Sequence, residues 1–249
     1  MILVMVPDEL LAGAPLVWAL PVDASCAAAA RSRVRAVLRA MAVPEGVVGD
    51  AVTIVSELAA NAFVHGFDDQ SPDAPPELVM YRRDVEIVTK VFDSAPWIGR
   101  LPRRCVRPDL YAESGRGLEM VNALTAEHGG SWGVHRTRSR LSAAAVSGKV
   151  AYFALPIPEP HPVVRSAPDC RTAGRVLEAA LMARGLKPVH RCEGLGMAVL
   201  SVRPEITVFA RQGGFSLTTP LTGTVRYPLA EVVEVSEVVV WCNEELDAG

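Results

Sequence analysis

The sequence lacks the features of several protein classes. It contains no CxxC pair, and its five cysteines are scattered, so it indicates neither a zinc site nor a disulfide framework. Its net charge of −3 is small and negative, which argues against direct nucleic-acid binding because such proteins usually carry a strongly basic face. No apolar run reaches membrane-spanning length, and the apolar start has no basic flank, so we expect neither a membrane segment nor a signal peptide. These absences favour a reducing cytoplasm.

The composition is that of an ordinary globular protein, and 249 residues suit two small domains or one large one. The proline-rich stretch PIPEPHPVVRSAP forms the clearest boundary, because such segments act as extended spacers. We therefore expect a first domain at 1–156, a linker at 157–168 and a small α/β domain at 169–249. In the last, Asp169 caps a helix that ends at Gly185, short strands follow, and 229–245 form a helix. This C-terminal part shows no catalytic constellation.

The stretch SELAANAFVHG, residues 56–66, ends a predicted apolar helix. Glu57, Asn61 and His65 recur in it every four residues, which places them along one edge. Gly66 is positioned to end the helix in the left-handed conformation. Two interpretations are open. In one, Asn61 is an oxygen ligand to Mg²⁺ and Glu57 is a base or water-orienting group beside a metal-bound anion. In the other, the helix is simply amphipathic, with Glu57 paired to an arginine and His65 interacting with the helix C-terminus.

Two predicted strands follow, at Glu77–Arg83 and Val85–Asp93, with a tight turn near Asp84 between them. The second strand is strongly apolar and ends on the acid Asp93, which leads directly into Ser-Ala-Pro. An aspartate at the end of an apolar strand is a common position for a ligand contact. The alternative is a simple turn-forming aspartate.

Residues 97–114 show no clear periodicity and carry four arginines, which either contact an anion or are solvated. They lead into the glycines of Ser114-Gly115-Arg116-Gly117 and a predicted helix at 118–128. Glycines at a helix start let backbone N–H groups approach a phosphate, although glycines serve turns more often. A basic connection at 136–148 is expected to be loose. After it, Lys149 begins a last strand, with its ammonium group either near a phosphate or at the surface.

Taken in order, four motifs resemble those of the GHKL ATPase superfamily, which includes histidine kinases, gyrase B subunits and mismatch-repair MutL. They are ELAANAFVHG (57–66), VFDSAP (91–96), SGRGLEMVNAL (114–124) and GKVAYFALP (148–156). The closer resemblance is to bacterial anti-sigma-factor serine/threonine kinases, and it covers roughly residues 15–156. It implies a Bergerat fold of α+β class, a two-layer sandwich with helices on one face of a mixed sheet and ATP held between helices and a flexible lid. The link between His128 and Lys149 is longer than the family's usual one.

The resemblance also implies roles for single residues. Asn61 would bind the Mg²⁺ that bridges the phosphates of ATP, and Glu57 would be the catalytic acid that accepts or positions the proton of a substrate hydroxyl. Asp93 would accept a hydrogen bond from the adenine amino group. The other residues of the predicted nucleotide site are the phosphate-facing Gly115 and Gly117, the packing residue Leu118, and the cations Arg116 and Lys149.

The function implied is that of a cytoplasmic, ATP-binding regulator of transcription. It would phosphorylate an anti-sigma-factor antagonist on serine or threonine, bind a sigma factor, or do both, without direct contact to nucleic acid or membrane. Related proteins often form homodimers. A sensor histidine kinase is disfavoured because the first domain has no phospho-accepting histidine helix. The alternative is a nucleotide-gated protein-binding module with little or no kinase turnover, a function that would not need Glu57 and for which the extra C-terminal domain offers partner surface.

Overall fold

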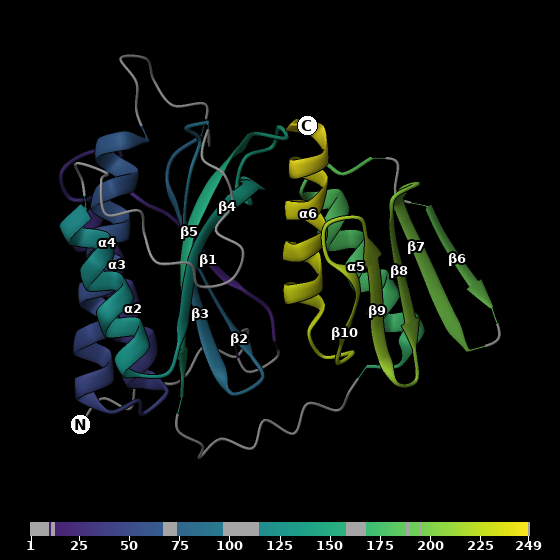
Figure 1. Ribbon diagram of the computed structural model, residues 1–249, viewed down its shortest axis with the longest axis horizontal. Coiled ribbons are helices and arrows are strands. Elements are labelled where there is room, and N and C mark those ends of the chain that lie inside the picture. The colour runs from purple at the N-terminus through teal and green to yellow at the C-terminus, as the bar shows by residue number, and fades with distance from the viewer. Residues whose placement is uncertain are drawn as a thin grey trace. The chain divides into compact units, whose positions relative to one another are not determined.

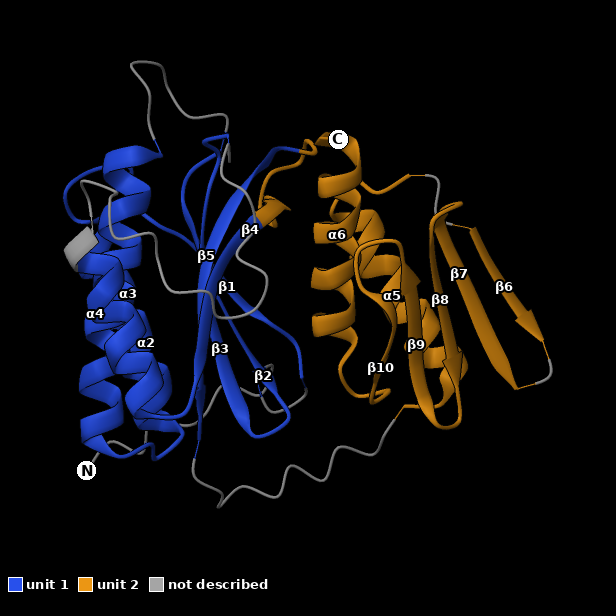
Figure 2. Cartoon of the chain, in the orientation of Figure 1, with its two compact units in different colours: residues 1–135, 146–161 blue, residues 136–145, 162–249 orange. Residues whose placement is uncertain are grey.

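The computed structural model describes residues 10, 13–66, 74–96, 115–157, 168–187, 190–194 and 196–248. The chain divides into two compact units, shown in Figure 2. The first comprises residues 1–135 and 146–161, and the second comprises 136–145 and 162–249. Residues 136–145, which the sequence suggests belong to the first domain, thus group with the second unit.

The first unit is built from a five-stranded sheet with helices on one face (Figure 1). The strands follow the order β1-β2-β3-β5-β4, and the described pairings β1–β2, β2–β3 and β3–β5 are all antiparallel. The predicted α+β class is confirmed. A mixed sheet also contains parallel pairs, and none of these three described pairs is parallel. The elements are β1 (Leu16–Ala19), α2 (Cys26–Ala40), α3 (Glu45–His65), β2 (Glu77–Arg83), β3 (Glu86–Asp93), α4 (Gly115–Glu127), β4 (Ser131–Arg138) and β5 (Ser147–Pro156).

Helix α3 is the central helix of this unit. Its apolar side, including Ile54, Val55 and Leu58, is fully buried against α2 and the sheet. Strand β3 alternates, so that Ile87 and Val91 join the same core. By length and composition α3 is also apolar enough to cross a membrane, which the sequence reading did not recognise.

Gly66 follows α3 in the right-handed region, with φ −84° and ψ −12°, so the predicted left-handed ending is wrong. The glycine is explained instead by the lack of room for a side chain at this position. A Cβ atom there would lie 2.0 Å from the carbonyl oxygen of Ala62 and 3.0 Å from the Cβ of Asp93. The glycine therefore lets the end of α3 approach the end of β3.

The second unit contains an antiparallel five-stranded sheet in the order β10-β9-β8-β7-β6, with its core against two helices. The predicted cap is confirmed, because Asp169 accepts hydrogen bonds from the backbone N–H groups of Arg171 and Thr172. Gly185, at φ +72°, follows the helix as predicted. The elements are α5 (Cys170–Ala183), β6 (His190–Gly194), β7 (Met197–Arg203), β8 (Ile206–Arg211), β9 (Gly214–Thr219), β10 (Gly223–Tyr227) and α6 (Val232–Ala248).

The basic segment 136–145, which begins within β4, is held by ion pairs within the second unit. Arg138 Nε lies 2.5 Å from Glu244 Oε1, and Arg140 Nη2 lies 2.6 Å from Glu237 Oε1, both on α6. Arg184, which is 4% exposed, pairs with the same Glu237 oxygen at 2.5 Å. The expectation of a loose connection is therefore wrong for these arginines.

Candidate functional site

Helix α3 carries the polar edge that the four-residue spacing predicts. Glu57 and Asn61 are half-buried, whereas His65, one turn further on, is exposed. Within the described part of the chain, neither Glu57 nor Asn61 has a hydrogen-bond or ion-pair partner. Arg31, from α2, donates instead to the hydroxyl of Ser56 at 2.8 Å. Because Glu57 and Asn61 are half-buried and keep access to solvent, their polar atoms are available to a ligand.

Gly117, in the first turn of α4, lies directly against Glu57. A Cβ atom at position 117 would be 2.6 Å from Glu57 Oε2, well inside van der Waals contact. The absence of a side chain thus brings the backbone of α4 to the carboxylate. The first N–H groups of a helix have no partner within the helix, and its dipole favours negative charge there. The N–H groups at the start of α4 can therefore receive an anion such as a phosphate, with the Glu57 carboxylate beside it.

Asp93 ends strand β3 and is only 4% exposed. Its Oδ1 atom accepts hydrogen bonds from Lys149 Nζ at 2.6 Å and from the backbone N–H of Ala95 at 3.1 Å. Burial raises the pKa of the Asp93 carboxyl from its ordinary value, while the charge and hydrogen bond of Lys149 act in the opposite direction. The carboxyl group is thus buried and held by named donors, as a site for recognising a ligand's donor group requires.

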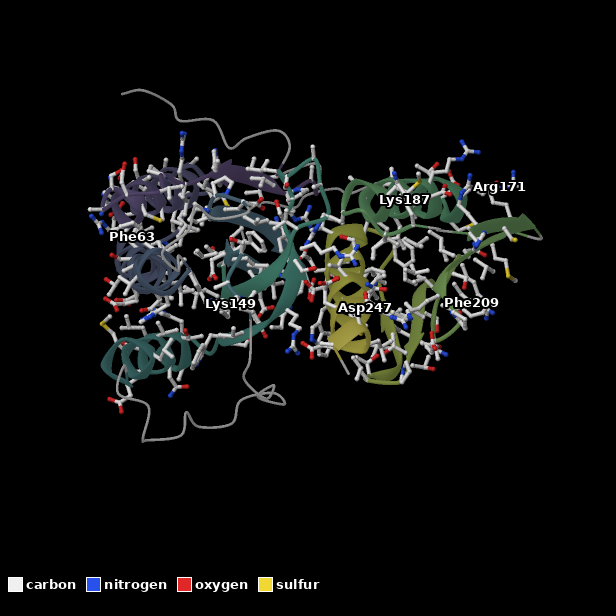
Figure 3. All side chains as sticks on the ribbon, turned by 90° about the horizontal axis from the view of Figure 1, so that it is seen from above. Phe63, Lys149, Arg171, Lys187, Phe209 and Asp247 are labelled. Atoms are coloured by element: carbon white, nitrogen blue, oxygen red, sulfur yellow. The ribbon has the colours of Figure 1, made fainter. Side chains whose placement is uncertain are left out.

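Lys149 lies opposite Asp93 in the β3–β5 register. Residues two apart along a strand share a face, so Lys149, which is labelled in Figure 3, lies on the same face of β5 as Phe153, a residue of the helix-covered core. Gly148 permits this pairing, because a Cβ atom there would lie 2.2 Å from the carbonyl oxygen of Asp93. The sequence suggests either a phosphate contact or a surface position for Lys149, whereas the structure pairs it with Asp93.

The structure thus brings the predicted residues to two places along one helix. Glu57 meets Gly117 at one, and Gly66, just beyond the C-terminal end of α3, meets Asp93 at the other. Nine residues separate the two contacts, which corresponds to about 13 Å of helical rise. An extended ligand with a polar ring at one end and anionic groups at the other matches this spacing.

Other predicted residues are described only in part. Leu118 is half-buried and packs against the core of the first unit. Gly115 is the first residue of α4. The side chain of Arg116 and the whole predicted lid, 97–114, lie outside the described residues.

The described donors of this site are compatible with Mg²⁺. Among the described residues, no group of three histidine, cysteine or acidic side chains is placed to hold a metal ion. Mg²⁺ keeps several waters and often takes one or two protein oxygens together with phosphate oxygens. The half-buried amide of Asn61 is one such oxygen donor.

Sequence reasoning missed the close approaches that assemble the site. The pairing of Lys149 with Asp93 joins residues 56 apart, so no local pattern reveals it. Gly66 and Gly148 were visible as glycines, but their reason is a neighbouring backbone or side chain from another element. Only two features of the sequence point to the ion pair. Asp93 and Lys149 both lie at strand ends, and the alternation of side chains along each strand puts them on the same face.

A cavity of about 390 Å³ lies in the second unit, and none of the predicted site residues lines it. Its walls combine cations with acids: Arg203 Nη1 lies 2.8 Å from Asp247 Oδ1, and Arg138 lies 3.7 Å from the other oxygen of Asp247. The charges of its lining are thus largely paired among themselves.

Part of the chain is similar to a known protein family. Residues 20–141 match the family described as the histidine kinase-like ATPase domain. Among solved structures, the chain is similar to the RsbU and RsbW domains of Rv1364c from Mycobacterium tuberculosis, with 19% identity and a TM-score of 0.39. That match covers 59% of this chain and 33% of the other, so the chain spans about one third of the solved protein's length. The curated proteins include no match.

The family match covers the elements that carry Glu57, Asn61, Asp93 and Gly117. Residues 20–141, just under half of the chain, therefore match an ATP-binding domain of the histidine kinase-like (GHKL) type.

Proposed function

We propose that this protein is an Mg-ATP-dependent serine/threonine kinase of the anti-sigma-factor type, acting on an antagonist protein and binding a sigma factor. The observation that carries the proposal is the contact between Gly117 and Glu57, which puts a carboxylate that has no partner among the described residues beside the start of α4. A protein that only bound nucleotide would not need a carboxylate at the phosphate end. The four motifs, in their order along the chain, support the same family branch.

The nucleotide would lie along α3. Asp93 would accept a hydrogen bond from the adenine amino group, and the glycine-flanked start of α4 would hold the phosphates through backbone N–H groups. Guanine offers a carbonyl where adenine offers an amino group. Facing the buried Asp93 carboxylate, it would leave an acceptor unpaired, at a cost of about 1–3 kcal/mol.

The transfer would need little covalent chemistry from the protein. The hydroxyl oxygen of the substrate attacks the γ-phosphorus, the bond from that phosphorus to the β–γ bridging oxygen breaks, and ADP leaves. Glu57 takes the hydroxyl proton or orients the hydroxyl for attack. Asn61 would hold Mg²⁺, which neutralises phosphate charge when bound.

Labelled ATP tests this proposal directly. The protein is incubated with [γ-³²P]ATP, Mg²⁺ and a panel of anti-sigma antagonist domains, and transfer is read from the labelled protein bands. We expect transfer to one of them by wild type and a loss of about 100-fold or more in Glu57→Ala. Glu45→Ala is the matched control, because Glu45 lies at the exposed start of the same helix. Undiminished transfer by Glu57→Ala would contradict the assignment of the base.

The binding-module alternative makes a different prediction in the same experiment. It is favoured by the second unit, which offers surface beyond the ATPase domain. ATP-dependent complex formation without any transfer by wild type would support it and remove the kinase. Both functions require nucleotide binding. Mg-ATP at about 100 times its Kd for wild type should therefore add roughly 2.7 kcal/mol to the free energy of unfolding, and Asn61→Ala and Asp93→Ala should lose most of that gain at the same nucleotide concentration.

A further inference from the structure

Asp93 would face the base in the proposed site, and its two carboxylate oxygens differ in the hydrogen bonds they accept. Among the described residues, both hydrogen-bond donors to Asp93, the ammonium of Lys149 at 2.6 Å and the N–H of Ala95 at 3.1 Å, bind the same oxygen, Oδ1. Within the described residues, Oδ2 receives no hydrogen bond. A carboxylate has acceptor positions on both oxygens. Oδ2 is thus the atom left for a ligand.

We propose that Lys149 is a positioning residue of the base pocket, which holds Oδ1 of Asp93 so that Oδ2 stays an ionised acceptor for the amino group of the base. This inference rests on the proposed nucleotide site. It assigns Lys149 to recognition of the base and not to the phosphates. Lys149 acts through Asp93 and need not touch the nucleotide itself.

Three features of the structure support this role. First, β5 places Lys149 directly opposite Asp93, and Gly148 lets the two strands approach closely enough for the pairing. Second, the carboxyl group is almost fully buried, an environment that favours its protonated form. A protonated Asp93 would place a hydrogen on one oxygen and weaken the acceptor that an amino group needs. The ammonium of Lys149 opposes that change.

Third, the surroundings fix the rotation of the carboxylate. The N–H of Ala95 and the ammonium of Lys149 approach Oδ1 together, and Gly66 packs against the Cβ of Asp93. Without Lys149, only the Ala95 N–H would remain to distinguish one oxygen from the other among these contacts. Recognition of the amino group would then lose an ionised and correctly oriented acceptor.

The test compares two nucleotides that differ only in the amino group. Kd values for ATP and for purine riboside triphosphate, which lacks the 6-amino group, are measured by calorimetry with the full chain and Mg²⁺. We expect Lys149→Met to weaken ATP binding about tenfold, the size of one charge-assisted hydrogen bond, and to change the Kd for purine riboside triphosphate less than about twofold. Lys187→Met is the control, because Lys187 is exposed in the second unit and should leave both values unchanged.

Three comparisons make the result decisive. Asp93→Ala should already remove the preference for ATP, so adding Lys149→Met to it should weaken ATP binding no further. Lys149→Gln keeps a hydrogen-bond donor without the charge, and it replaces Lys149→Met if that variant does not fold. It should show the same reduced preference for ATP over purine riboside triphosphate. An equal loss for both nucleotides, or a loss that grows from ADP to ATP, would overturn the proposal and return Lys149 to the phosphates. If wild type binds neither nucleotide, the proposed function itself fails.

Discussion

Adding one methyl group at Gly117 tests the contact on which the phosphate end of the site depends. Alanine is normally favoured over glycine inside a helix, by about 1 kcal/mol. At position 117, however, the new Cβ would lie 2.6 Å from Glu57 Oε2, so the carboxylate must rotate away or the start of α4 must move. An off-rotamer side chain costs about 1 kcal/mol. The gain and the cost should therefore cancel in Gly117→Ala.

Gly49→Ala provides the matched comparison. Gly49 lies within α3, and nothing is within 4 Å of the place its Cβ would occupy. This variant should gain the full increment of about 1 kcal/mol in the free energy of unfolding, measured by urea titration with circular dichroism. Gly117→Ala should gain little or nothing in the same assay, and its ATP-dependent transfer should fall because Glu57 is displaced.

A double-mutant cycle identifies the cause. Truncating Glu57 removes the atom that the methyl group would meet, so Gly117→Ala should become stabilising, by about 1 kcal/mol, in the Glu57→Ala background. If Gly117→Ala is as stabilising as Gly49→Ala in the wild-type background and keeps its transfer activity, the close approach of α4 to Glu57 is not as described.

Other predictions concern the metal, the second unit and pH. Removing Mg²⁺ with EDTA should weaken ATP binding to wild type but not further weaken it to Asn61→Ala, as calorimetry can show. Arg184→Met should lower the free energy of unfolding by about 3 kcal/mol, because it leaves the buried Glu237 without one of its partners, whereas the exposed Arg171→Met should change it by less than about 0.5 kcal/mol in urea titration. The pKa of Asp169 is lowered, mainly by hydrogen bonds from Thr172. The stabilisation by this cap should therefore be present above a pH of about 4 and be lost as pH falls through the lowered pKa; Asp169→Asn should remove that part of the acid dependence of thermal unfolding.

Local patterns predicted the elements well where a residue's role is set by its own segment. Asp169 and Gly185 mark the two ends of a helix, because a cap and a left-handed ending act within one turn. The spacing of Glu57 and Asn61 was readable for the same reason, since helical periodicity alone puts them on one edge. Gly66 shows the limit. Its sequence position suited a left-handed ending, but its conformation is right-handed and its size is required by Asp93, from another element.

The basic segment 136–145 shows why charge patterns mislead when the partners are distant. Its arginines look like a solvated, basic connection, because the nearby sequence offers few acids. Their partners are Glu237 and Glu244, about 100 residues later on α6. A local reading counts only neighbours along the chain, so it treats as excess charge what the fold neutralises.

The role of Lys149 also depends on a partner that is distant in the sequence. A lysine after a glycine at a strand start suggests a phosphate contact when the strand is read alone. In the pairing of β5 with β3, Lys149 lies opposite the buried carboxylate of Asp93. If the lysine turned to a distant phosphate instead, the Asp93 carboxylate would be left buried without a partner for its charge. The ion pair is therefore the lower-energy state before any ligand arrives. A nucleotide that binds must accept Asp93 with one oxygen already held, which makes the strand register itself part of how this site would distinguish one base from another.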